Sequence, residues 1–441
     1  MKILLVNPIT HSLYGKGYKD VPSLSRALIR KLIEFPRPVS LFILSVLTPK
    51  KHEVKIIEGE PDEIDYDIDV DLVGISFTTR LAPLAYQIAD RFRERGIKVV
   101  VGGWHPSALP EEALKHADSV VIGEGEYIWK DILNDLEKNK LKKFYMQSKP
   151  TDPHDIPSLI PIFKDLKVPI GIQATRGCPY GCEFCAVTHM LHRRVFRTRP
   201  VEHVVDEIEK LPQNVFIFLD NSLTISPEYT KKLFREIISR GINKKFTCFG
   251  NIDTLGRDIE LLSLACKAGC VAWLVGFESV SQASLNWVKK KTNIVKNYKS
   301  AVSKIHDHGM YVIGNFMFGF DYDTTHVFDE TIDMIKQCEI DVPDIMILTP
   351  LPGTPLFERL ENEGRILTYD WSRYNFEDVV FQPKNMSAED LLYNSMRVFK
   401  EIYSVGNIIS RVQKAMKYGL YKFIDVAIRN FYLSKRRYQE Y

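Results

Sequence analysis

The first third of the chain alternates short apolar runs with amphipathic stretches. Five runs rich in β-branched residues end in glycine, asparagine or a polar residue, as buried strands do: 2–7, 54–59, 71–77, 97–103 and 119–125. After the third run, Leu84, Ile88 and Phe92 repeat every four residues before Gly96, which predicts a helix with a glycine C-cap. Strands that alternate with helices predict a doubly wound parallel sheet, in which ligands bind beyond the carboxyl ends of the strands.

A second alternating series follows a proline-rich stretch. Residues 146–168 contain four prolines and little periodicity, so we interpret them as a linker after a first domain, 1–145. Six strand candidates come next, separated by amphipathic helical stretches: 171–177, 215–221, 245–251, 271–279, 310–319 and 344–351. They predict a partial (β/α)6 TIM-type barrel over 169–360, with function at the carboxyl ends of its strands. Residues 361–441 indicate a small helix-rich domain.

These patterns together predict an α/β protein that begins with a Rossmann-like doubly wound sheet. The composition is that of a globular chain, because 45% of its 441 residues are hydrophobic and 26% are charged. No apolar run is long enough to span a bilayer, and the start, MKILLVNPIT, lacks the features of a secretory signal. We therefore expect a cytoplasmic protein, in which clustered cysteines bind metal or react rather than form disulfides.

Positive charge is concentrated in the last thirty residues. The net charge is +3, but residues 411–441 hold eight Lys or Arg against two acids, which gives +6 there and −3 elsewhere. We therefore expect no nucleic-acid footprint over the body of the protein. The tail also holds seven aromatic residues, and its predicted apolar helical face consists of Leu420, Phe423, Ala427 and Phe431, with Lys422, Arg429 and 435–437 away from it. Such a helix either lies on an anionic membrane surface or packs on the barrel.

Three of the seven cysteines lie within eight residues, directly after the first predicted barrel strand: Cys178, Cys182 and Cys185. The glycines and the proline of this stretch, GCPYGCEFC, let the loop curl tightly around a bound group. Three thiolates can bind zinc if a fourth ligand, such as His189 or His192, closes the site. Alternatively, they can hold a four-iron cluster and leave one iron open to a substrate.

The cysteine spacing, with the aromatic Phe184 directly before the third cysteine, resembles the signature of the radical S-adenosylmethionine (radical SAM) enzymes. The resemblance implies a [4Fe-4S] cluster on the three cysteines and an external one-electron donor such as flavodoxin or ferredoxin. It also implies that S-adenosylmethionine is cleaved to a 5′-deoxyadenosyl radical, which takes a hydrogen atom from a substrate. It favours the cluster over zinc and makes the two nearby histidines ordinary loop residues.

Segments at later strand ends are similar to the S-adenosylmethionine-binding segments of that family: FLDNS at 218–222, GFES at 276–279 and NFMFGF at 315–320. The side chains that the resemblance places near this cofactor are Phe184, Asp220, Asn221, Glu278 and Ser279. An Asp-Asn pair after a strand is also common in simple turns.

The other four cysteines have a structural and a metal-binding interpretation. Cys266 and Cys270 stand four residues apart on a predicted helix, one face of which could bind an extra metal. Free cysteine is also a common small core residue, and we expect Cys248 and Cys338 to be buried in the core.

Residues 1–145 resemble the cobalamin-binding domain found in front of many radical SAM enzymes. The matching pieces are KILLVNP, DLVGISFTT, VVVGGWHPSALPEE and VVIGEGE. The resemblance places six residues against the corrin or its nucleotide tail: Ser76, Thr78, Gly102, Gly103, His105 and Gly125. The cobalt-ligating Asp-x-His-x-x-Gly loop is not matched, since Ile9 stands two before His11 and Gly15 is one step too far along. We therefore expect His11 not to ligate cobalt, and an empty, vestigial domain stays an alternative.

The two resemblances together imply cobalamin-dependent methylation of an unactivated carbon. The membrane interpretation of the tail favours a lipid or another hydrophobic small molecule as substrate. One alternative is a radical enzyme that joins or cyclises carbon skeletons with a vestigial first domain. Another is a non-catalytic or electron-transferring iron–sulfur protein. A tRNA methylthiolase ranks lower, because no cysteine precedes Cys178 and the tail does not resemble an RNA-binding module.

Overall fold

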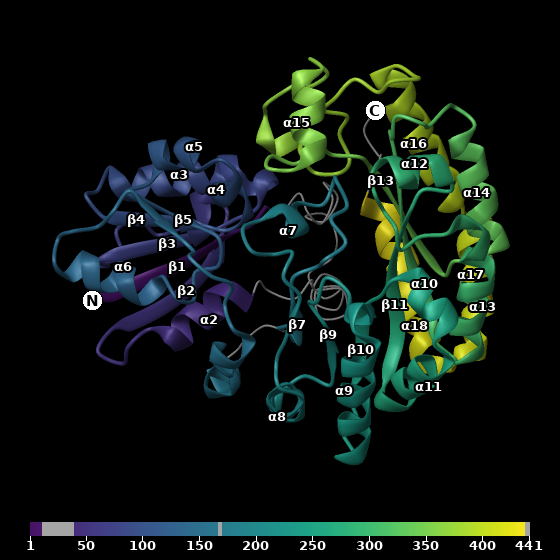
Figure 1. The fold of residues 1–441 in the computed structure, drawn as a ribbon, viewed down its shortest axis with the longest axis horizontal. Coiled ribbons are helices and arrows are strands. Elements are labelled where there is room, and N and C mark those ends of the chain that lie inside the picture. The colour runs from purple at the N-terminus through teal and green to yellow at the C-terminus, as the bar shows by residue number, and fades with distance from the viewer. Residues whose placement is uncertain (11–38, 166–169, 437–441) are drawn as a thin grey trace.

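The computed structural model describes residues 1–10, 39–165 and 170–436. Two parallel sheets form the two halves of the molecule, and the segment that carries the clustered cysteines runs between them (Figure 1). The α/β class predicted from the sequence is confirmed. His11 lies outside the described residues.

The first sheet has six parallel strands in the order β2-β1-β3-β4-β5-β6. The strands are β1 (Lys2–Pro8), β2 (Glu53–Gly59), β3 (Leu72–Ser76), β4 (Lys98–Gly102), β5 (Ser119–Ile122) and β6 (Phe144–Met146). Five of them match the predicted apolar runs. The sixth has only three residues, too few for any periodicity, and the sequence did not indicate it.

Helices cover both faces of this sheet, as a doubly wound fold requires. They are α2 (Val39–Leu47), α3 (Ala82–Arg93), α4 (Trp104–Ala108), α5 (Pro110–His116) and α6 (Trp129–Glu137). Strand β1 shows the reason, because Leu4 and Val6 enter the core under α3 while Ile3 and Leu5 enter the core under α2 and α6. A parallel strand that is buried on both faces is apolar at every position.

The second sheet has five parallel strands in the order β13-β12-β11-β10-β9. They are β9 (Val215–Ile217), β10 (Lys245–Phe249), β11 (Cys270–Glu278), β12 (Tyr311–Phe318) and β13 (Val342–Ile347). The helices of this half are α8 (Val201–Lys210), α9 (Pro227–Ser239), α10 (Ile252–Arg257), α11 (Ile259–Ala268), α12 (Gln282–Trp287), α13 (Tyr298–Asp307) and α14 (Val327–Gln337). The strands curve into the partial barrel seen at the right of Figure 1.

The predicted first barrel strand, 171–177, is shorter than expected. It joins the sheet through a parallel bridge between Ile172 and Phe218, beyond the end of β9. The chain then leaves the sheet, and β7 (Thr175–Arg176) pairs antiparallel with β8 (Arg197–Thr198). The cysteine stretch and the short helix α7 (Ala186–His189) therefore form an excursion between two paired strands.

The C-terminal segment from residue 355 onward ties the two halves together. It contains α15 (Pro355–Asn362), α16 (Ala388–Ile402), α17 (Val405–Ala415) and α18 (Leu420–Arg436). Four residues from this segment enter the core of the first half beside α3: Phe357, Trp371, Tyr374 and Val380. The proline-rich segment likewise packs on the barrel core through Ile156, Leu159 and Phe163.

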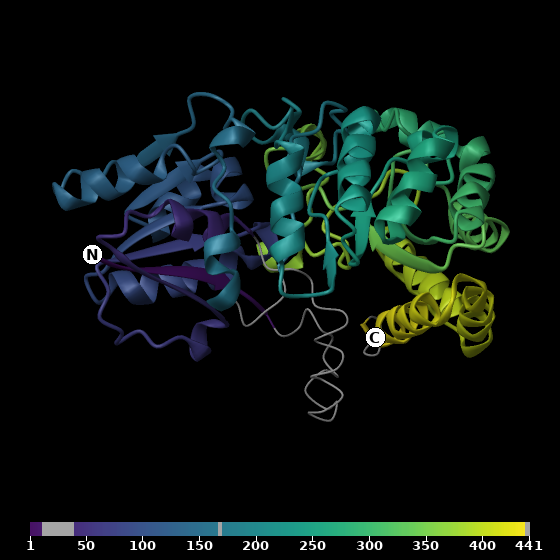
Figure 2. The ribbon, with the colours of Figure 1, turned by 90° about the horizontal axis from the view of Figure 1, so that it is seen from below.

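Helix α18 packs on the barrel, below the sheet in Figure 2. Asn430 donates to the carbonyl oxygen of Asp341 at 2.9 Å, and Tyr311 donates to the Asp425 carboxylate at 2.5 Å. Arg429 is only 26% exposed, and its Nε donates to the same Asp425 at 3.0 Å.

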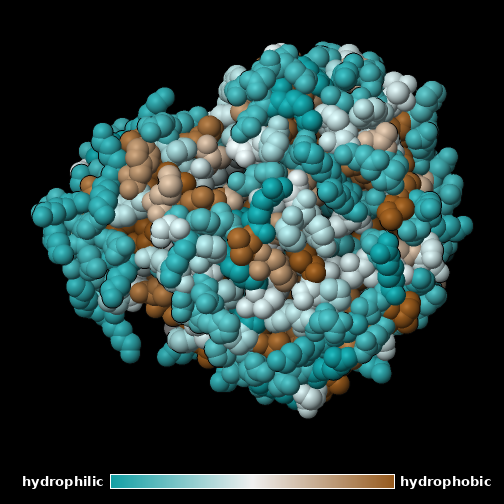
Figure 3. Space-filling model, viewed as in Figure 1, coloured by the Kyte–Doolittle hydropathy of each residue, from teal (hydrophilic) through white to brown (hydrophobic). Residues whose placement is uncertain are grey.

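The helix does not bury the apolar face predicted for the tail. Val426 and Asn430, which were not part of that face, are buried against the barrel, whereas Leu420 and Phe431 are exposed and Phe423 and Ala427 are half-buried. No helix within the described ranges is long and apolar enough to cross a membrane. The face shown in Figure 3 is largely polar, with apolar residues gathered in separate groups.

Candidate functional site

The loop from 177 to 196, which we call the cysteine loop, is held in a tight curl by its glycines. Gly177 has a φ of 84°, and a Cβ there would lie 2.2 Å from the carbonyl oxygen of Val195. Gly181 has a φ of 69° and lies directly against the Arg194 guanidinium. The amide of Cys178 donates to the carbonyl oxygen of Arg193 at 2.8 Å, which closes the base of the loop. Only glycine fits these two positions.

The three thiols share one buried environment. Burial raises the pKa of Cys182 to about 12, and it raises the pKa of Cys178 and of Cys185 as well. The ammonium of Lys290 acts on all three thiols in the opposite direction. A metal group that binds thiolates here must displace three protons, and Lys290 favours that step electrostatically.

The donor set fits an iron–sulfur cluster better than zinc. His189 Nε2 lies 3.1 Å from the carbonyl oxygen of Cys182, and His192 Nε2 lies 3.3 Å from that of Gln147, so both rings are hydrogen-bonded to the backbone. Across the described ranges, no three His, Cys, Asp or Glu side chains converge on a single ion. A structural zinc site needs four convergent ligands, whereas a cluster with an open iron needs three thiolates spread around a larger group.

Glu278 and Lys290 form a buried ion pair beside the thiols. Glu278 ends β11 with a φ of 64°, and Lys290 Nζ lies 2.8 Å from its Oε1. Asn293 holds this strand end by donating to the carbonyl oxygens of Gly276 and Phe277, at 2.9 and 2.8 Å. Burial lowers the pKa of Lys290, but the charges of Glu278 and Cys182 outweigh it, so the ammonium stays charged. The site thus offers one carboxylate and one ammonium.

Sequence reasoning missed Lys290. It belongs to the run Lys289–Lys291, and a run of lysines usually indicates a solvated surface. The only signal was its position, twelve residues after Glu278 and just before a polar turn. That position gives no information on burial.

Asp220 lies at the carboxyl end of the sheet, with its carboxylate turned toward the base of the cysteine loop. It accepts hydrogen bonds from the amide and the hydroxyl of Thr175, the latter at 2.6 Å, and from the amide of Ala174 at 3.2 Å. Burial raises its pKa to about 6 despite these hydrogen bonds. Asp220 therefore anchors the strand that leads into Cys178, and its assignment to S-adenosylmethionine stays a prediction.

The other residues assigned to S-adenosylmethionine also lie at the carboxyl ends of barrel strands or on the cysteine loop. Asn221 is half-buried after β9, and Ser279 is buried with its hydroxyl accepting from the amide of Ser281 at 3.0 Å. Phe184 makes an edge-on contact with Phe320, with ring centroids 6.4 Å apart. Their roles stay predictions.

The residues assigned to cobalamin line one end of the first sheet. Ser76, Gly102 and Gly125 lie at or just beyond the ends of three neighbouring strands, and Thr78 is exposed there. Gly103 has a φ of 105°, and a Cβ there would lie 2.6 Å from the carbonyl oxygen of Phe77. This edge of small residues lets a large planar group approach the backbone closely, which fits a corrin.

His105 is turned away from this edge. It is fully buried, and its Nε2 lies 3.1 Å from the Glu112 carboxylate, which also accepts from Trp371 Nε1 at 2.9 Å. Within the described residues its Nδ1 has no hydrogen-bond partner. The placement of His105 against cobalamin stays a prediction.

The interpretation of Cys266 and Cys270 as one helical face is wrong. Gly269 ends α11 with a φ of 104°, and Cys270 is the first residue of β11. Cys270 Sγ instead lies 3.7 Å from Cys248 Sγ in the core between adjacent strands. The expected i, i+4 geometry fails because the glycine C-cap comes between the two cysteines.

Family models match most of the described chain. Residues 172–335 match the Radical SAM superfamily, residues 31–133 match the B12 binding domain, and residues 354–424 match a domain of unknown function. The first two matches coincide with the cysteine loop and its barrel and with the first sheet.

Relatives share this arrangement over most of their length. The chain is 33% identical over 391 residues to the bacteriochlorophyllide d C-12(1)-methyltransferase of Chlorobaculum tepidum, covering 85% of this chain and 84% of that protein. It is 31% identical to the C-8(2)-methyltransferase of the same organism, covering 85% and 87%. Its fold matches that of TsrM from Kitasatospora setae with cobalamin and a [4Fe-4S] cluster bound, with a TM-score of 0.68, 15% identity and 99% of each chain covered.

Proposed function

The chain belongs to the cobalamin-dependent radical SAM methyltransferases, and from this premise we propose that it methylates an unactivated carbon of a hydrophobic small molecule. The observation that carries the proposal is the cysteine loop, which places one buried and two half-buried cysteines between a barrel and a sheet edge suited to a corrin. As a member of this family the protein is an enzyme that uses a [4Fe-4S] cluster, S-adenosylmethionine and cobalamin. The alternative of an electron-transfer protein is therefore not supported.

In this proposal each side chain has one task. Cys178, Cys182 and Cys185 would hold the cluster, next to which S-adenosylmethionine would bind. Glu278 and Lys290 meet the ammonium and the carboxylate of that cofactor, whose charges are opposite to theirs. When bound, these groups supply a carbon-centred radical and a methyl group. An external one-electron donor, such as flavodoxin or ferredoxin, reduces the cluster.

The hydrophobic substrate is supported by two observations. The two relatives from Chlorobaculum tepidum are named as methyltransferases of bacteriochlorophyllide d. In addition, helices α17 and α18 pack on each other, and each carries an exposed apolar stripe. The first stripe consists of Val405, Ile409 and Met416, the last of which directly follows α17. The second consists of Leu420, Ile424 and Phe431. We propose that this surface, which we call the tail stripe, touches a membrane where such substrates partition.

Anaerobic reconstitution with iron, sulfide and cobalamin tests the proposal. The loaded enzyme, given S-adenosylmethionine, a reductant and bacteriochlorophyllide d or a lipid extract, should release 5′-deoxyadenosine and a product heavier by one methylene unit. Cys182→Ala should abolish both, and Cys338→Ala, a buried cysteine outside the loop, should abolish neither. A cluster that forms while cobalamin does not bind would overturn the proposal, and a product with unchanged carbon count would favour the cyclising alternative.

A further inference from the structure

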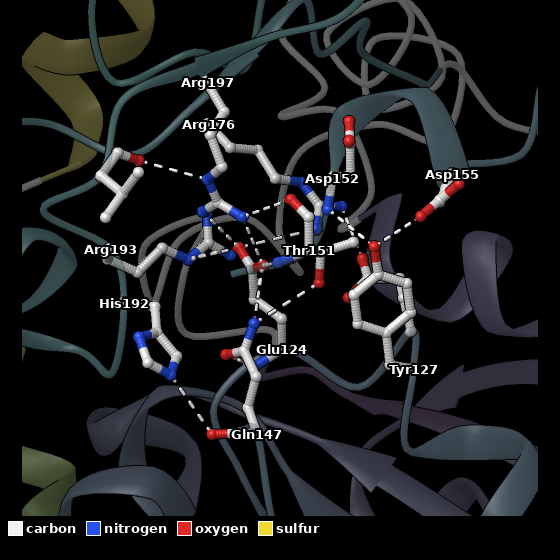
Figure 4. Close-up of polar contacts among 12 residues, drawn as sticks. Glu124, Tyr127, Gln147, Thr151, Asp152, Asp155, Arg176, His192, Arg193 and Arg197 are labelled. Carbon is white, nitrogen blue, oxygen red and sulfur yellow. Dashed lines mark hydrogen bonds and ion pairs between the residues drawn. The ribbon is translucent and has the colours of Figure 1, made fainter. Parts of the chain in front are cut away.

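Glu124 gathers three arginines around one buried carboxylate (Figure 4). It lies two residues beyond the end of β5, and its side chain is 1% exposed. Arg197 donates to both of its oxygens, at 2.8 and 3.0 Å, and Arg193 Nε lies 3.1 Å from Oε1. Arg176 Nη1 lies 3.6 Å from the same oxygen. A bidentate guanidinium–carboxylate pair is the most directional ion pair available to a protein.

The three arginines all come from the base of the cysteine loop. Arg176 and Arg197 are paired residues of β7 and β8, the strands between which the loop begins and ends. Arg193 lies inside the loop, and its carbonyl oxygen accepts the amide of Cys178. Both ends of the cysteine loop and one residue inside it therefore contact Glu124.

Further contacts fix the carboxylate from the side of the first sheet. Gln147 Nε2 and the amide of Thr151 donate to Oε2, both at 3.1 Å, and the amide of Glu124 donates to Gln147 Oε1 at 2.8 Å. Arg197 also donates to the carbonyl oxygen of Thr151 at 2.6 Å. Gln147 directly follows β6 and Thr151 lies five residues beyond it, so these contacts tie the carboxylate to this sheet.

The charges make this carboxylate hard to replace. Arg176 also pairs with Glu126 at 2.6 Å, so three guanidinium groups face two carboxylates. Burial raises the pKa of Glu124, but the hydrogen bond of Arg197 and the nearby arginine charges hold it well below its usual range. Burial lowers the pKa of Arg193 to about 10, although its side chain is still 17% exposed. Removal of the Glu124 charge would leave buried cations uncompensated.

We propose that Glu124 is a positioning residue that sets the cysteine loop in register with the corrin edge of the first sheet. Gly125, which the sequence places against cobalamin, is the next residue in the chain, so a single peptide bond joins Glu124 to the predicted cobalamin site. We call Glu124, Arg176, Arg193 and Arg197 the clasp. The proposal rests on the proposed function, because the relative placement of the cysteine loop and the corrin edge matters only if both the cluster and cobalamin bind.

The proposal predicts a specific catalytic defect in variants of the clasp. If the loop and the corrin edge lose their register, the radical still forms on the barrel side, but the methyl group is no longer presented to it. Small misplacements of reacting groups cost about a hundred-fold in rate. Glu124→Gln keeps the size and most of the shape of the side chain while removing its charge. We expect it to raise the ratio of 5′-deoxyadenosine to methylated product by about ten-fold or more.

The experiment compares Glu124→Gln, Glu124→Asp and Arg197→Lys in the full chain. Glu137→Gln is the matched control, because Glu137 belongs to the same half and pairs with Lys51 at 2.6 Å on the surface. Hydrogen–deuterium exchange of 174–198 is measured without cofactors. The dipolar coupling between cob(II)alamin and the reduced cluster is measured by electron paramagnetic resonance in the loaded enzyme.

The clasp predicts faster exchange of 174–198 and an altered dipolar coupling in Glu124→Gln, a smaller change in Arg197→Lys, and no change in the control. Glu124→Asp, which keeps the charge, should recover part of the wild-type exchange if Glu124→Gln folds poorly. Exchange and coupling that match wild type in Glu124→Gln would overturn the proposal. Failure of the proposed function would appear differently, as a wild-type enzyme that makes no methylated product, and the exchange measurement would still test the clasp.

Discussion

Lys290 Nζ lies 2.8 Å from Glu278 Oε1, and this buried pair stands beside the three cysteine thiols. The ammonium therefore interacts electrostatically with two groups: the Glu278 carboxylate at the end of β11 and the thiolates of the cysteine loop. Radical SAM chemistry requires that the cluster accept an electron, so a fixed cation at this position matters for its potential.

We expect Lys290→Met to lower the reduction potential of the cluster and to weaken S-adenosylmethionine binding. Loss of a nearby charge in a protein interior is worth on the order of a few kcal/mol, and it would also leave Glu278 without a counter-charge. The potential is read from a redox titration followed by electron paramagnetic resonance. Lys289→Met is the control, because that side chain is 62% exposed and pairs with Glu183 at the surface of the site. Equal potentials in the two variants would exclude this role.

Gly177→Ala should prevent cluster assembly. The added Cβ would lie 2.2 Å from the Val195 carbonyl oxygen at a φ of 84°, so the loop base cannot close. Gly241→Ala is the matched control, since Gly241 has a φ of 63° with nothing within 4 Å of its Cβ position. It should cost only about 1 kcal/mol of unfolding free energy and leave iron binding intact. Iron and sulfide are measured after reconstitution. Loss of both in Gly177→Ala but not in Gly241→Ala would show that the loop base must close for the cluster to assemble, and that backbone strain alone does not prevent assembly.

The Asp220 carboxyl should make stability depend on pH. Burial raises its pKa to about 6 in the folded protein from 3.8, so the folded state holds this proton more tightly than the unfolded chain. Its contribution to the free energy of unfolding is therefore fully present below about pH 4 and is lost as the pH rises to about 6. The loss amounts to roughly 2 to 3 kcal/mol. We expect the stability gap between wild type and Asp220→Asn to change across that window. Denaturant unfolding between pH 4 and 7 measures it, and a constant gap would contradict the assignment.

The tail stripe should bind membranes in proportion to its apolar exposure. Replacing Leu420 and Phe431, which are 75% and 58% exposed, with serine should reduce sedimentation with anionic lipid vesicles severalfold while leaving the melting temperature nearly unchanged. Val215→Ser, an exposed apolar residue at the start of β9, serves as the control. Equal vesicle binding by wild type and the double variant would contradict the proposal that the tail stripe touches a membrane.

Much of the fold followed from local pattern. The apolar runs predicted five of six strands in the first sheet and the strands of the second, because buried parallel strands are apolar along their length. The short strand β6 was missed for lack of periodicity, and Cys270 was misplaced because a glycine C-cap separates it from α11. The first failure concerns a strand too short to show a period, and the second concerns the end of a helix, where sequence signals are weakest.

The sequence by itself predicted the ligand set, since three thiols at fixed spacing on a glycine-bearing loop are a local property of the chain. It also determined that small residues end the strands of the first sheet. Only the tertiary structure decided which charges face one another: that Lys290 is a buried partner of Glu278, and that Glu124 compensates three arginines more than fifty residues away. Burial and charge compensation depend on what the rest of the chain brings alongside, and no run of neighbouring residues contains that information.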